Sequence, residues 1–390
     1  MKIVLLFRSY GPYHLARLGA ARKHHSILAL EYSAADKDYI WDAGAEKRDA
    51  GVIALTGSGW PQGSARRSFV RALCREVRTF SPDAVAIPGY SESFAVTALR
   101  TCRAIGIPTI LMSDTHAGST RNAVFRESVK RKLISLYDAA LVAGTPQVEY
   151  LSGLGFPWER MALGYDVIDN QHFSARSSLA VEFHHAPAPR YFFCCARFVE
   201  RKNLSLLIEA FARYRLAAGD QGWDLVIAGD GPLRTALQRR VTATSFSGHI
   251  HLVGRKSYEE LPRFYQAASA FVLPSLAEEW GLVVNEAMAA GLPVLVSKRA
   301  GCSRDLVEHG MNGFTFDPSS ADELAARMRL IAISPRREEM GNASRRIIAG
   351  WDVNRFASGL SQTSEAAQST VHSPRSRFGA AFAAVLSHRS

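Results

Sequence analysis

Two carboxylates eight positions apart, Glu278 and Glu286, stand where they could bind a sugar next to a phosphate. Residues 270–273 form an apolar run typical of a buried strand, and residues 282–290 favour a helix. Gly281 at the turn lets the backbone approach a ligand, and the N–H groups that begin the helix form a natural phosphate site. Because a carboxylate beside a phosphate needs another partner, sugar hydroxyls are suitable ligands for these glutamates. We therefore hypothesise a sugar and phosphate site at this turn.

A basic pair, Arg197 and Lys202, lies between a predicted strand at 191–196 and a helix that begins near Asn203. A guanidinium and an ammonium there can both reach a diphosphate, while helix N–H groups complete the binding site. An exposed basic turn is the alternative, since Arg201 also lies in this loop. The carboxylate pair in the same half of the chain favours the phosphate interpretation. Asn203 is predicted to cap the helix.

Four polar residues of the first half, His14, Glu92, Asp114 and His116, fall in loops that follow predicted strands. Each alone is more often structural than catalytic, but ligands on parallel sheets collect at the carboxyl ends of the strands. His116 could accept a proton from an acceptor molecule near neutral pH. This edge of the first half is therefore a second candidate site.

Two further motifs are interpreted as lacking chemistry. Asp36-Lys37-Asp38 fits the D-x-D pattern that holds a metal in one class of sugar transferases, but it lies in a polar loop, so we interpret it as a solvated turn. We predict no metal and no other cofactor. Gly229-Asp230-Gly231 is not part of a G-x-G-x-x-G or Walker sequence, which disfavours a dehydrogenase or a P-loop enzyme.

The composition indicates a globular chain that attracts anions. Of its 390 residues, 47% are hydrophobic and 21% are charged, and this length favours two domains. The net charge of +11 suits phosphate ligands, acidic lipids or nucleic acid, and a solvated basic surface explains it comparably well. The five cysteines have no C-x-x-C spacing, which indicates a reducing compartment. No apolar run approaches the roughly 20 residues of a spanning helix. We expect a cytoplasmic protein, soluble or peripheral on the inner face of the membrane.

Short apolar strands alternate with helices twice along the chain, which predicts an α/β fold with two parallel sheets. The first series occupies residues 1–175 and the second residues 191–350. Residues 176–190 lose periodicity and gain Ser, His and Pro, as a linker does. A last helix at 351–375 and a frayed tail at 376–390 follow. The predicted strands are 3–7, 26–32, 84–88, 108–112, 139–142, 191–196, 225–228, 249–253, 270–273 and 293–297.

A basic segment at residues 121–134 mixes Arg and Lys with apolar residues, as in an amphipathic helix. Such a helix suits an anionic membrane surface, and a solvated face on a core helix is a nearly equal alternative. Nucleic acid is disfavoured, because aromatic residues do not alternate with the charges as stacking platforms. We therefore expect an anionic membrane surface among the partners and no nucleic acid.

With these motifs in place, the second half resembles the donor domain of retaining glycosyltransferases of family 4. That family has the GT-B architecture, in which two Rossmann-like, doubly wound domains face each other across a cleft. Its E-x7-E pattern is matched from Glu278 to Glu286, followed by Ala-Met-Ala-Ala-Gly-Leu-Pro-Val. Its phosphate-binding Arg and Lys are matched by Arg197 and Lys202. The resemblance extends over residues 160–330.

The resemblance also implies roles for these residues. Glu286 would bind the ribose and Glu278 the transferred sugar, with Glu279 the weaker choice. Gly11 stands where the family has a glycine-rich loop near the donor phosphates, with one glycine here rather than a pair. His116 is the counterpart of a catalytic-loop histidine. The expected catalytic residues are Arg197, Lys202, Glu278 and His116, and the expected donor-binding residues are Gly11, Gly229, Val253, Gly254, Gly281, Leu282, Val283 and Glu286.

These residues and the resemblance together predict a retaining glycosyltransferase. It would move a hexose-type sugar from a nucleoside diphosphate to a hydroxyl of a glycan or of a lipid-linked acceptor, without a metal, and its domains would close by a hinge. Two alternatives remain open at this point. One is a GT-B epimerase acting on a sugar nucleotide, and the other is a non-catalytic protein that binds sugar nucleotides or membranes. The donor base could be that of UDP, GDP or ADP.

Overall fold

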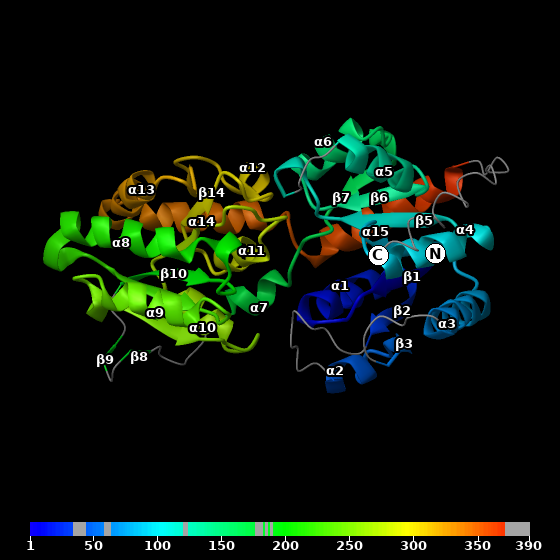
Figure 1. The fold of residues 1–390 in the computed structure, drawn as a ribbon, viewed down its shortest axis with the longest axis horizontal. Helices are drawn as coiled ribbons and strands as arrows, with labels where there is room; N and C mark the ends of the chain where they lie inside the picture. The colour runs from blue at the N-terminus through cyan, green and yellow to red at the C-terminus, as the bar shows by residue number, and fades with distance from the viewer. Residues whose placement is uncertain are drawn as a thin grey trace. The chain divides into compact units, whose positions relative to one another are not determined.

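The computed structural model describes residues 1–33, 44–57, 64–119, 124–175, 182–183, 186–187 and 190–370 (Figure 1). The chain forms two compact units, which we call unit 1, Met1–Val167 with Val353–Ser390, and unit 2, Ile168–Asp352. Asp36-Lys37-Asp38, most of the predicted linker and the predicted tail lie outside the described residues.

Unit 1 contains a seven-stranded sheet in which every pair of neighbours is parallel. Its strands are β1 (Lys2–Phe7), β2 (Ser26–Ser33), β3 (Ile53–Thr56), β4 (Ala84–Pro88), β5 (Thr109–Ser113), β6 (Ala139–Val142) and β7 (Met161–Leu163). The spatial order β3-β2-β1-β4-β5-β6-β7 reverses direction between β1 and β4. Ligands of such sheets bind at the carboxyl ends of the strands, near this switch point.

Helices pack on the unit 1 sheet. Successive side chains of a strand point to opposite faces, so a strand of consecutive apolar residues must be covered on both. The helices are α1 (Pro12–Arg22), α2 (Gly44–Asp49), α3 (Ser64–Phe80), α4 (Ser93–Ala104), α5 (Val124–Ile134), α6 (Thr145–Gly153) and α15 (Val353–Ser369). Val4 and Leu6 of β1 pack in one cluster with Phe69 and Leu73 of α3 and Leu99 of α4. The last helix, α15, packs against α1, β6 and β7, so the end of the chain completes unit 1.

Unit 2 contains a six-stranded sheet that is parallel throughout. Its strands are β10 (Tyr191–Cys195), β11 (Asp224–Ala228), β12 (Ile250–Gly254), β13 (Ala270–Leu273), β14 (Val294–Ser297) and β15 (Gly313–Phe316). The order β12-β11-β10-β13-β14-β15 places β13 beside β10, so the loops that follow these two strands meet at the switch point. A separate antiparallel pair is formed by β8 (Glu182–Phe183) and β9 (Ala186–Pro187).

The core of unit 2 joins the sheet to two long helices. The helices of the unit are α7 (Asn170–Ser174), α8 (Leu204–Ala218), α9 (Arg234–Thr242), α10 (Leu261–Ala267), α11 (Leu282–Ala289), α12 (Ser303–Leu306), α13 (Ala321–Ile333) and α14 (Arg337–Ile348). Helices α8 and α13 pack on each other. Phe211 of α8 and Met328 of α13 are fully buried with Phe192 and Ile227 of the sheet. This packing gives the strand ends of unit 2 a rigid base.

The predicted α/β class with two doubly wound sheets is confirmed, and each predicted strand is present to within one residue at either end. The sequence analysis missed β3, β7 and β15, because strands of three or four residues carry too little periodicity to be recognised, and it interpreted the residues of β8 and β9 as linker. Among the described helices, none has both the length and the apolar character required to cross a bilayer.

Candidate functional site

The switch point of the unit 2 sheet brings the predicted basic and acidic residues together. Lys202 follows β10, Glu278 follows β13, and the lysine Nζ forms an ion pair with Oε2 of the glutamate. Ser275, which is fully buried, donates its hydroxyl to the same Oε2 at 3.0 Å. Both charged side chains are nearly buried, at 12% and 9% exposure, so solvent screens this pair little. The structure therefore holds a cation and a carboxylate at the position where the sheet topology favours a ligand.

A second layer of contacts joins the same two loops. The backbone N–H of Leu276 donates to the carbonyl of Arg201 at 2.8 Å. The Arg201 guanidinium pairs with Glu279 at 2.8 Å, and both side chains are 36% exposed. Such an exposed pair contributes little to stability, about 0–1 kcal/mol. Arg201 and Glu279 therefore lie on the outer side of the contact that Lys202 and Glu278 make. Arg197 lies in the same loop, shortly after the end of β10, and is partly exposed.

Asn203 has a different role from the predicted one. Its backbone is left-handed, with φ of 56°, and its side chain makes no capping hydrogen bond to α8. The amide nitrogen donates instead to the carbonyls of Pro274, at 3.2 Å, and Pro318, at 2.8 Å. Asn203 thus stands at the predicted N-cap position of α8, but its side chain binds distant loops that sequence spacing does not show. Asn203 connects the loops after β10, β13 and β15, and it directly follows Lys202.

The glycine loop after β11 is held against its neighbours by backbone hydrogen bonds. Gly229 donates to the carbonyl of Gly254 at 2.8 Å, and Ala196 donates to that of Ala228 at 3.0 Å. Gly229 has φ of 141°, and a Cβ there would lie 1.9 Å from the carbonyl oxygen of Ala196. Only glycine allows this approach. The structure thus places Gly229 beside Gly254, which with Val253 ends β12, on the same edge of the sheet as Lys202.

Gly281 makes the turn that starts α11. Its φ of 107° is left-handed, and a Cβ would lie 3.0 Å from Leu273 Cδ2 and 3.4 Å from Glu278 Cγ. Leu282 and Val283 are the first two residues of the helix and are partly exposed. N–H groups in a first helical turn lack intrahelical acceptors, and the helix dipole makes this end favourable for an anion. The predicted phosphate-binding turn therefore has the backbone geometry that this role requires.

Glu286 lies deeper than Glu278. It is fully buried on α11, and the hydroxyl of Tyr265, also fully buried, donates to its Oε2 at 2.6 Å. Burial raises the pKa of the Cys195 thiol well above its usual value, and the nearby Glu286 carboxylate adds to this effect. The end of β10 and the inner face of α11 are therefore close to each other around this carboxylate. Tyr265 is a site residue that spacing alone did not reveal.

The candidate residues of unit 1 follow the carboxyl ends of its strands, and His14 lies in the first turn of α1 rather than in the predicted loop. Gly11 precedes α1, and its N–H donates to Nδ1 of His14 at 3.1 Å. Burial and the positive charges of Arg17 and Lys47 lower the pKa of His14 to about 3. His14 is therefore neutral at physiological pH and structural in this arrangement. Glu92 is within 3.9 Å of Arg8 in an exposed contact.

A buried carboxylate that the sequence analysis did not single out holds the loop around Gly11. Glu31 of β2 accepts the N–H of Tyr10 at 3.0 Å and pairs with Lys47 at 3.1 Å. Ser9 also approaches Glu31, at 3.5 Å. No motif marks Glu31, because a single charge in an apolar strand has no characteristic spacing.

His116 is held as a hydrogen-bond acceptor at one ring nitrogen. It is 7% exposed, and Gly118 donates its N–H to Nδ1 at 3.2 Å. In the neutral ring the proton is then on Nε2, so this nitrogen donates rather than accepts. The carbonyl of Asp114 accepts from the Gln147 amide at 2.8 Å, which fixes the same loop. The geometry is more suited to donation from His116 Nε2 than to the predicted proton acceptance.

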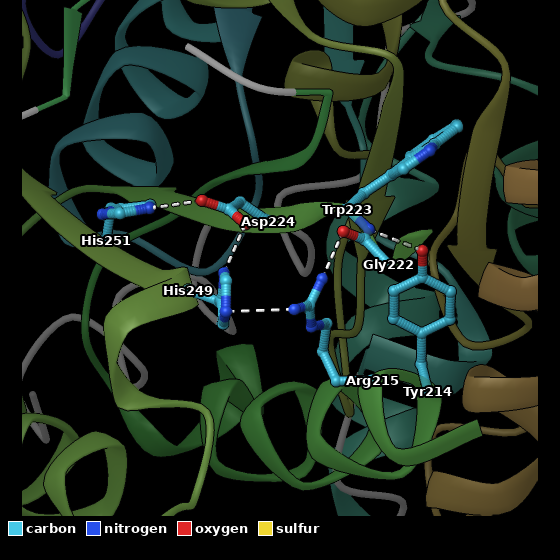
Figure 2. A network of polar contacts seen from close by, with 7 residues as sticks. All are labelled: Tyr214, Arg215, Gly222, Trp223, Asp224, His249 and His251. Atoms are coloured by element: carbon cyan, nitrogen blue, oxygen red, sulfur yellow. Dashed lines mark hydrogen bonds and ion pairs between the residues drawn. The ribbon is translucent and has the colours of Figure 1, made fainter. Parts of the chain in front are cut away.

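No group of three or more His, Cys, Asp or Glu side chains that could hold a metal ion occurs in the part of the chain that the structure describes. One polar network of unit 2 lies away from the loops described above, at the amino ends of β11 and β12 (Figure 2). In it Asp224 accepts from His249 Nδ1 and His251 Nε2, each at 2.9 Å. Arg215 lies 3.0 Å from His249 Nε2 and donates to the carbonyl of Gly222. The network joins α8 to the two strands.

Comparison with known proteins gives matches in both sequence and fold. Residues 179–347 match the family model "Glycosyl transferases group 1". The chain is 30% identical over 182 residues to the amylovoran biosynthesis glycosyltransferase AmsK of Erwinia amylovora, covering 45% of this chain and 43% of that protein. It is also 30% identical over 176 residues to a GDP-mannose-dependent alpha-(1-6)-phosphatidylinositol monomannoside mannosyltransferase of Mycobacterium tuberculosis, covering 43% of this chain and 45% of that protein. The chain thus spans less than half the length of these curated relatives.

The fold is similar to the crystal structure of Anabaena Alr3699/HepE in complex with UDP. The TM-score is 0.72 at 17% identity, and the match covers 93% of this chain and 99% of that chain. At this identity the likeness concerns the fold, and it confirms the predicted GT-B class with two Rossmann-like domains.

Proposed function

We propose that this chain, whose residues 179–347 belong to the glycosyl transferases group 1, moves a sugar from a nucleoside diphosphate sugar to a hydroxyl acceptor with retention of configuration. The observation that carries the proposal is the meeting of Lys202 and Glu278 beside the first turn of α11. A cation and helix N–H groups suit a diphosphate, and a carboxylate suits sugar hydroxyls. No metal ion enters the proposal.

Lys202 is already paired with Glu278 in this structure, and this pairing suggests how the donor enters. An incoming diphosphate would replace the carboxylate as the partner of the ammonium. Ser275 would keep Glu278 in place, because its hydroxyl binds the same Oε2. The released carboxylate could then accept hydrogen bonds from the sugar. The Lys202–Glu278 ion pair would thus be replaced by contacts of both residues with the donor. No buried charge would be left unpaired, which would cost several kcal/mol.

Catalysis would depend on stabilising the leaving diphosphate. Its departure leaves positive, oxocarbenium-like charge on the sugar, as in glycoside hydrolysis. Arg197, Lys202 and the N–H groups of Leu282 and Val283 would bind the charge that develops on the diphosphate oxygens. The acceptor hydroxyl would attack from the face that the diphosphate leaves, and its proton would pass to an oxygen of the departing diphosphate. This route retains the configuration without a protein nucleophile.

We assign the ribose to Glu286 and the nucleobase to the edge formed by Gly229, Val253 and Gly254. Tyr265 supports this assignment, because its hydrogen bond at 2.6 Å orients the Glu286 carboxylate. Gly11, in unit 1, keeps the donor-binding role that the resemblance implies. His116 would act there as a hydrogen-bond donor through Nε2.

The acceptor is proposed to be a growing glycan or a lipid-linked saccharide, handled at the carboxyl edge of the unit 1 sheet. One relative acts, by its name, on a phosphatidylinositol mannoside, and another serves amylovoran biosynthesis. A lipid-linked acceptor would place the protein in the cytoplasm, peripheral on the inner face of the membrane, with anionic lipids as partners. The net charge of +11 supports such a partner.

The decisive experiment incubates the purified chain with labelled UDP-, GDP- and ADP-sugars and a membrane extract. We expect label to move from one donor into lipid or glycan. Lys202→Ala and Glu286→Ala should each lower kcat by a factor of about 100 or more, because each removes a group that binds the donor or its leaving charge. Circular dichroism of the variants checks that the fold is intact.

Other outcomes distinguish the alternatives. An isomerised sugar nucleotide without label in an acceptor would indicate an epimerase. Donor binding without turnover in any extract would indicate a non-catalytic protein. Full activity of either alanine variant would overturn the site assignment.

A further inference from the structure

Helix α3 of unit 1 carries a row of arginines along one side. At 100° per residue, positions 67, 71, 75 and 78 fall within an arc of about 80° and extend over about 16 Å of the helix axis. All four of these arginines are exposed: Arg67, Arg71, Arg75 and Arg78. The opposite side of the helix carries Phe69, Leu73 and Val77, which are fully buried. Packing of the apolar side therefore fixes the arginine row on the surface of unit 1.

Among the described residues, one acidic side chain pairs with this row. Arg75 is paired with Glu76 at 2.8 Å, and Glu76 is the one acidic residue of α3. Within the described ranges, no carboxylate lies within ion-pair distance of Arg67, Arg71 or Arg78. Three guanidinium groups are thus available to an external anion.

The surface next to the row is hollowed. A cavity of about 350 Å³ is lined by Arg66, Arg67, Val70 and Arg71. On the neighbouring helix α4, burial and the positive charge of Arg66 lower the pKa of Arg100. The region thus concentrates positive charge around a depression large enough for a phosphate-bearing group.

The segment predicted from the sequence to face a membrane is less suited to that role. On α5, Lys130 donates to Glu127 and to the Tyr150 hydroxyl, both at 2.7 Å, so its ammonium is directed into the protein. Arg131 and Lys132 remain exposed at the end of the helix. Among the side chains of α5 that the structure describes, these two exposed cations make a smaller anion-binding surface than the row on α3.

We propose that the arginine face of α3, formed by Arg67, Arg71 and Arg78 with the adjoining hollow, docks unit 1 on an anionic phospholipid surface. This proposal names the surface that would bind the membrane partner given under the proposed function, and it rests on that function. A straight row of guanidinium groups can contact several lipid phosphates at once, and arginine binds phosphate oxygens in pairs.

The chemistry of the face favours lipid over other polyanions. Its exposed positions carry arginine, serine and threonine, so there is no aromatic platform on which nucleic acid bases could stack. There is also no large exposed apolar side chain on α3 to insert among acyl chains. Attachment would therefore be electrostatic, reversible and sensitive to salt.

Sedimentation with vesicles tests the proposal on the full chain. The wild type should sediment with vesicles of phosphatidylglycerol and phosphatidylcholine, should not sediment with phosphatidylcholine alone, and should be released by high salt. Combined Arg67→Gln, Arg71→Gln and Arg78→Gln should weaken binding to the anionic vesicles about a hundredfold, since each arginine near such a surface contributes a factor of about five.

A charge-matched control separates the α3 face from net charge. A second triple variant, Arg239→Gln, Arg240→Gln and Arg346→Gln, removes the same number of charges from exposed positions of unit 2. Its affinity for anionic vesicles should stay within twofold of the wild-type value. Equal losses in the two triple variants would overturn the proposal. The proposal would also be overturned if the wild type did not bind anionic vesicles, or if RNA at low concentration displaced the protein from them.

The test does not depend on the enzymatic reaction. Transfer to a water-soluble acceptor should be unchanged in the α3 variant, because none of its residues belongs to the proposed donor site. Vesicle binding without sugar transfer would support the docking face and contradict the proposed function. Sugar transfer without vesicle binding would support the proposed function and contradict the docking face.

Discussion

At the scale of single residues, the central finding is that Glu278 and Lys202 form an ion pair with each other. The sequence analysis assigned a sugar to Glu278 and a phosphate to Lys202. The structure adds that each neutralises the other, with Ser275 as a third member. The ion pair and the Ser275 hydrogen bond thus hold the Lys202 ammonium at the carboxyl end of the unit 2 sheet.

Asn203 gives a prediction at this scale. Asn203→Gly keeps the left-handed backbone but removes two hydrogen bonds, which should cost about 1–2 kcal/mol. Asn203→Ala should cost about 1 kcal/mol more, because alanine resists this conformation. Asn203→Asp should resemble the glycine variant, since aspartate tolerates the backbone but lacks the donors.

Thermal unfolding and donor KM measure both effects. Loosening the loops that carry Lys202 and Glu278 should raise KM in all three variants. Glycine and alanine variants of equal stability would contradict the proposed backbone strain at Asn203.

At the scale of elements, the loops after β10, β11 and β12 behave as one unit because backbone hydrogen bonds join them. This dependence makes Gly229→Ala a severe change. Its Cβ would lie 1.9 Å from the Ala196 carbonyl oxygen, so the loops must separate, at a cost of about 3 kcal/mol.

Gly248 is a matched control in the same unit. A Cβ there meets nothing within 4 Å, so Gly248→Ala should be close to neutral. Chemical denaturation compares the two variants, and equal stability would show that the loop after β11 moves freely.

The network at the amino ends of β11 and β12 predicts a dependence of stability on pH. Burial raises the pKa of Asp224, but hydrogen bonds from His251 and His249 outweigh it, so the pKa is lowered overall (Figure 2). A carboxyl with a lowered folded pKa stabilises the fold above its unfolded pKa, about 3.9. That contribution is lost as the pH falls through the folded value.

Asp224→Asn tests this contribution. The variant should be less stable than the wild type at pH 7, and the difference should shrink as the pH falls below about 4. Urea unfolding at several pH values measures it. A constant difference across this range would show that the Asp224 charge is not involved.

At the scale of the whole molecule, the chain builds unit 1 from two distant segments. Helix α15 returns to pack against α1, β6 and β7, so unit 1 is incomplete without the end of the described chain. Gly359 makes this packing close. A Cβ at this position would lie 2.5 Å from the Leu163 carbonyl oxygen and 2.6 Å from Leu141 Cδ1.

Gly359→Ala should therefore lower the melting temperature of unit 1, although alanine is favoured over glycine in helices by about 1 kcal/mol. Ser358→Ala, at the exposed neighbouring position, should be neutral or slightly stabilising. Differential scanning calorimetry compares the two. A stabilised Gly359→Ala variant would mean that α15 shifts easily on the sheet.

The sequence by itself determined the alternation of strands and helices, the two sheets and the grouping of Arg197, Lys202, Gly281 and both glutamates. The strands and helices follow from local periodicity, and the grouping of the site residues follows from a short motif. Periodicity and motif both depend on residues that are close together in the sequence. Boundaries to within a residue were predictable because the buried parallel strands are short, continuous apolar runs.

Only the tertiary structure decided which partners these residues take. Tyr265 reaches Glu286, Asn203 reaches Pro318, and Glu31 holds the loop before Gly11 through contacts between residues far apart in the chain. The sequence analysis placed a basic membrane-facing segment at residues 121–134, and the structure exposes a row of arginines on α3. Charge content is visible in a sequence, but whether a lysine turns inward to a glutamate or an arginine row stays exposed depends on packing. Composition therefore predicts an attraction to anions, whereas the fold determines where on the surface the positive charges gather.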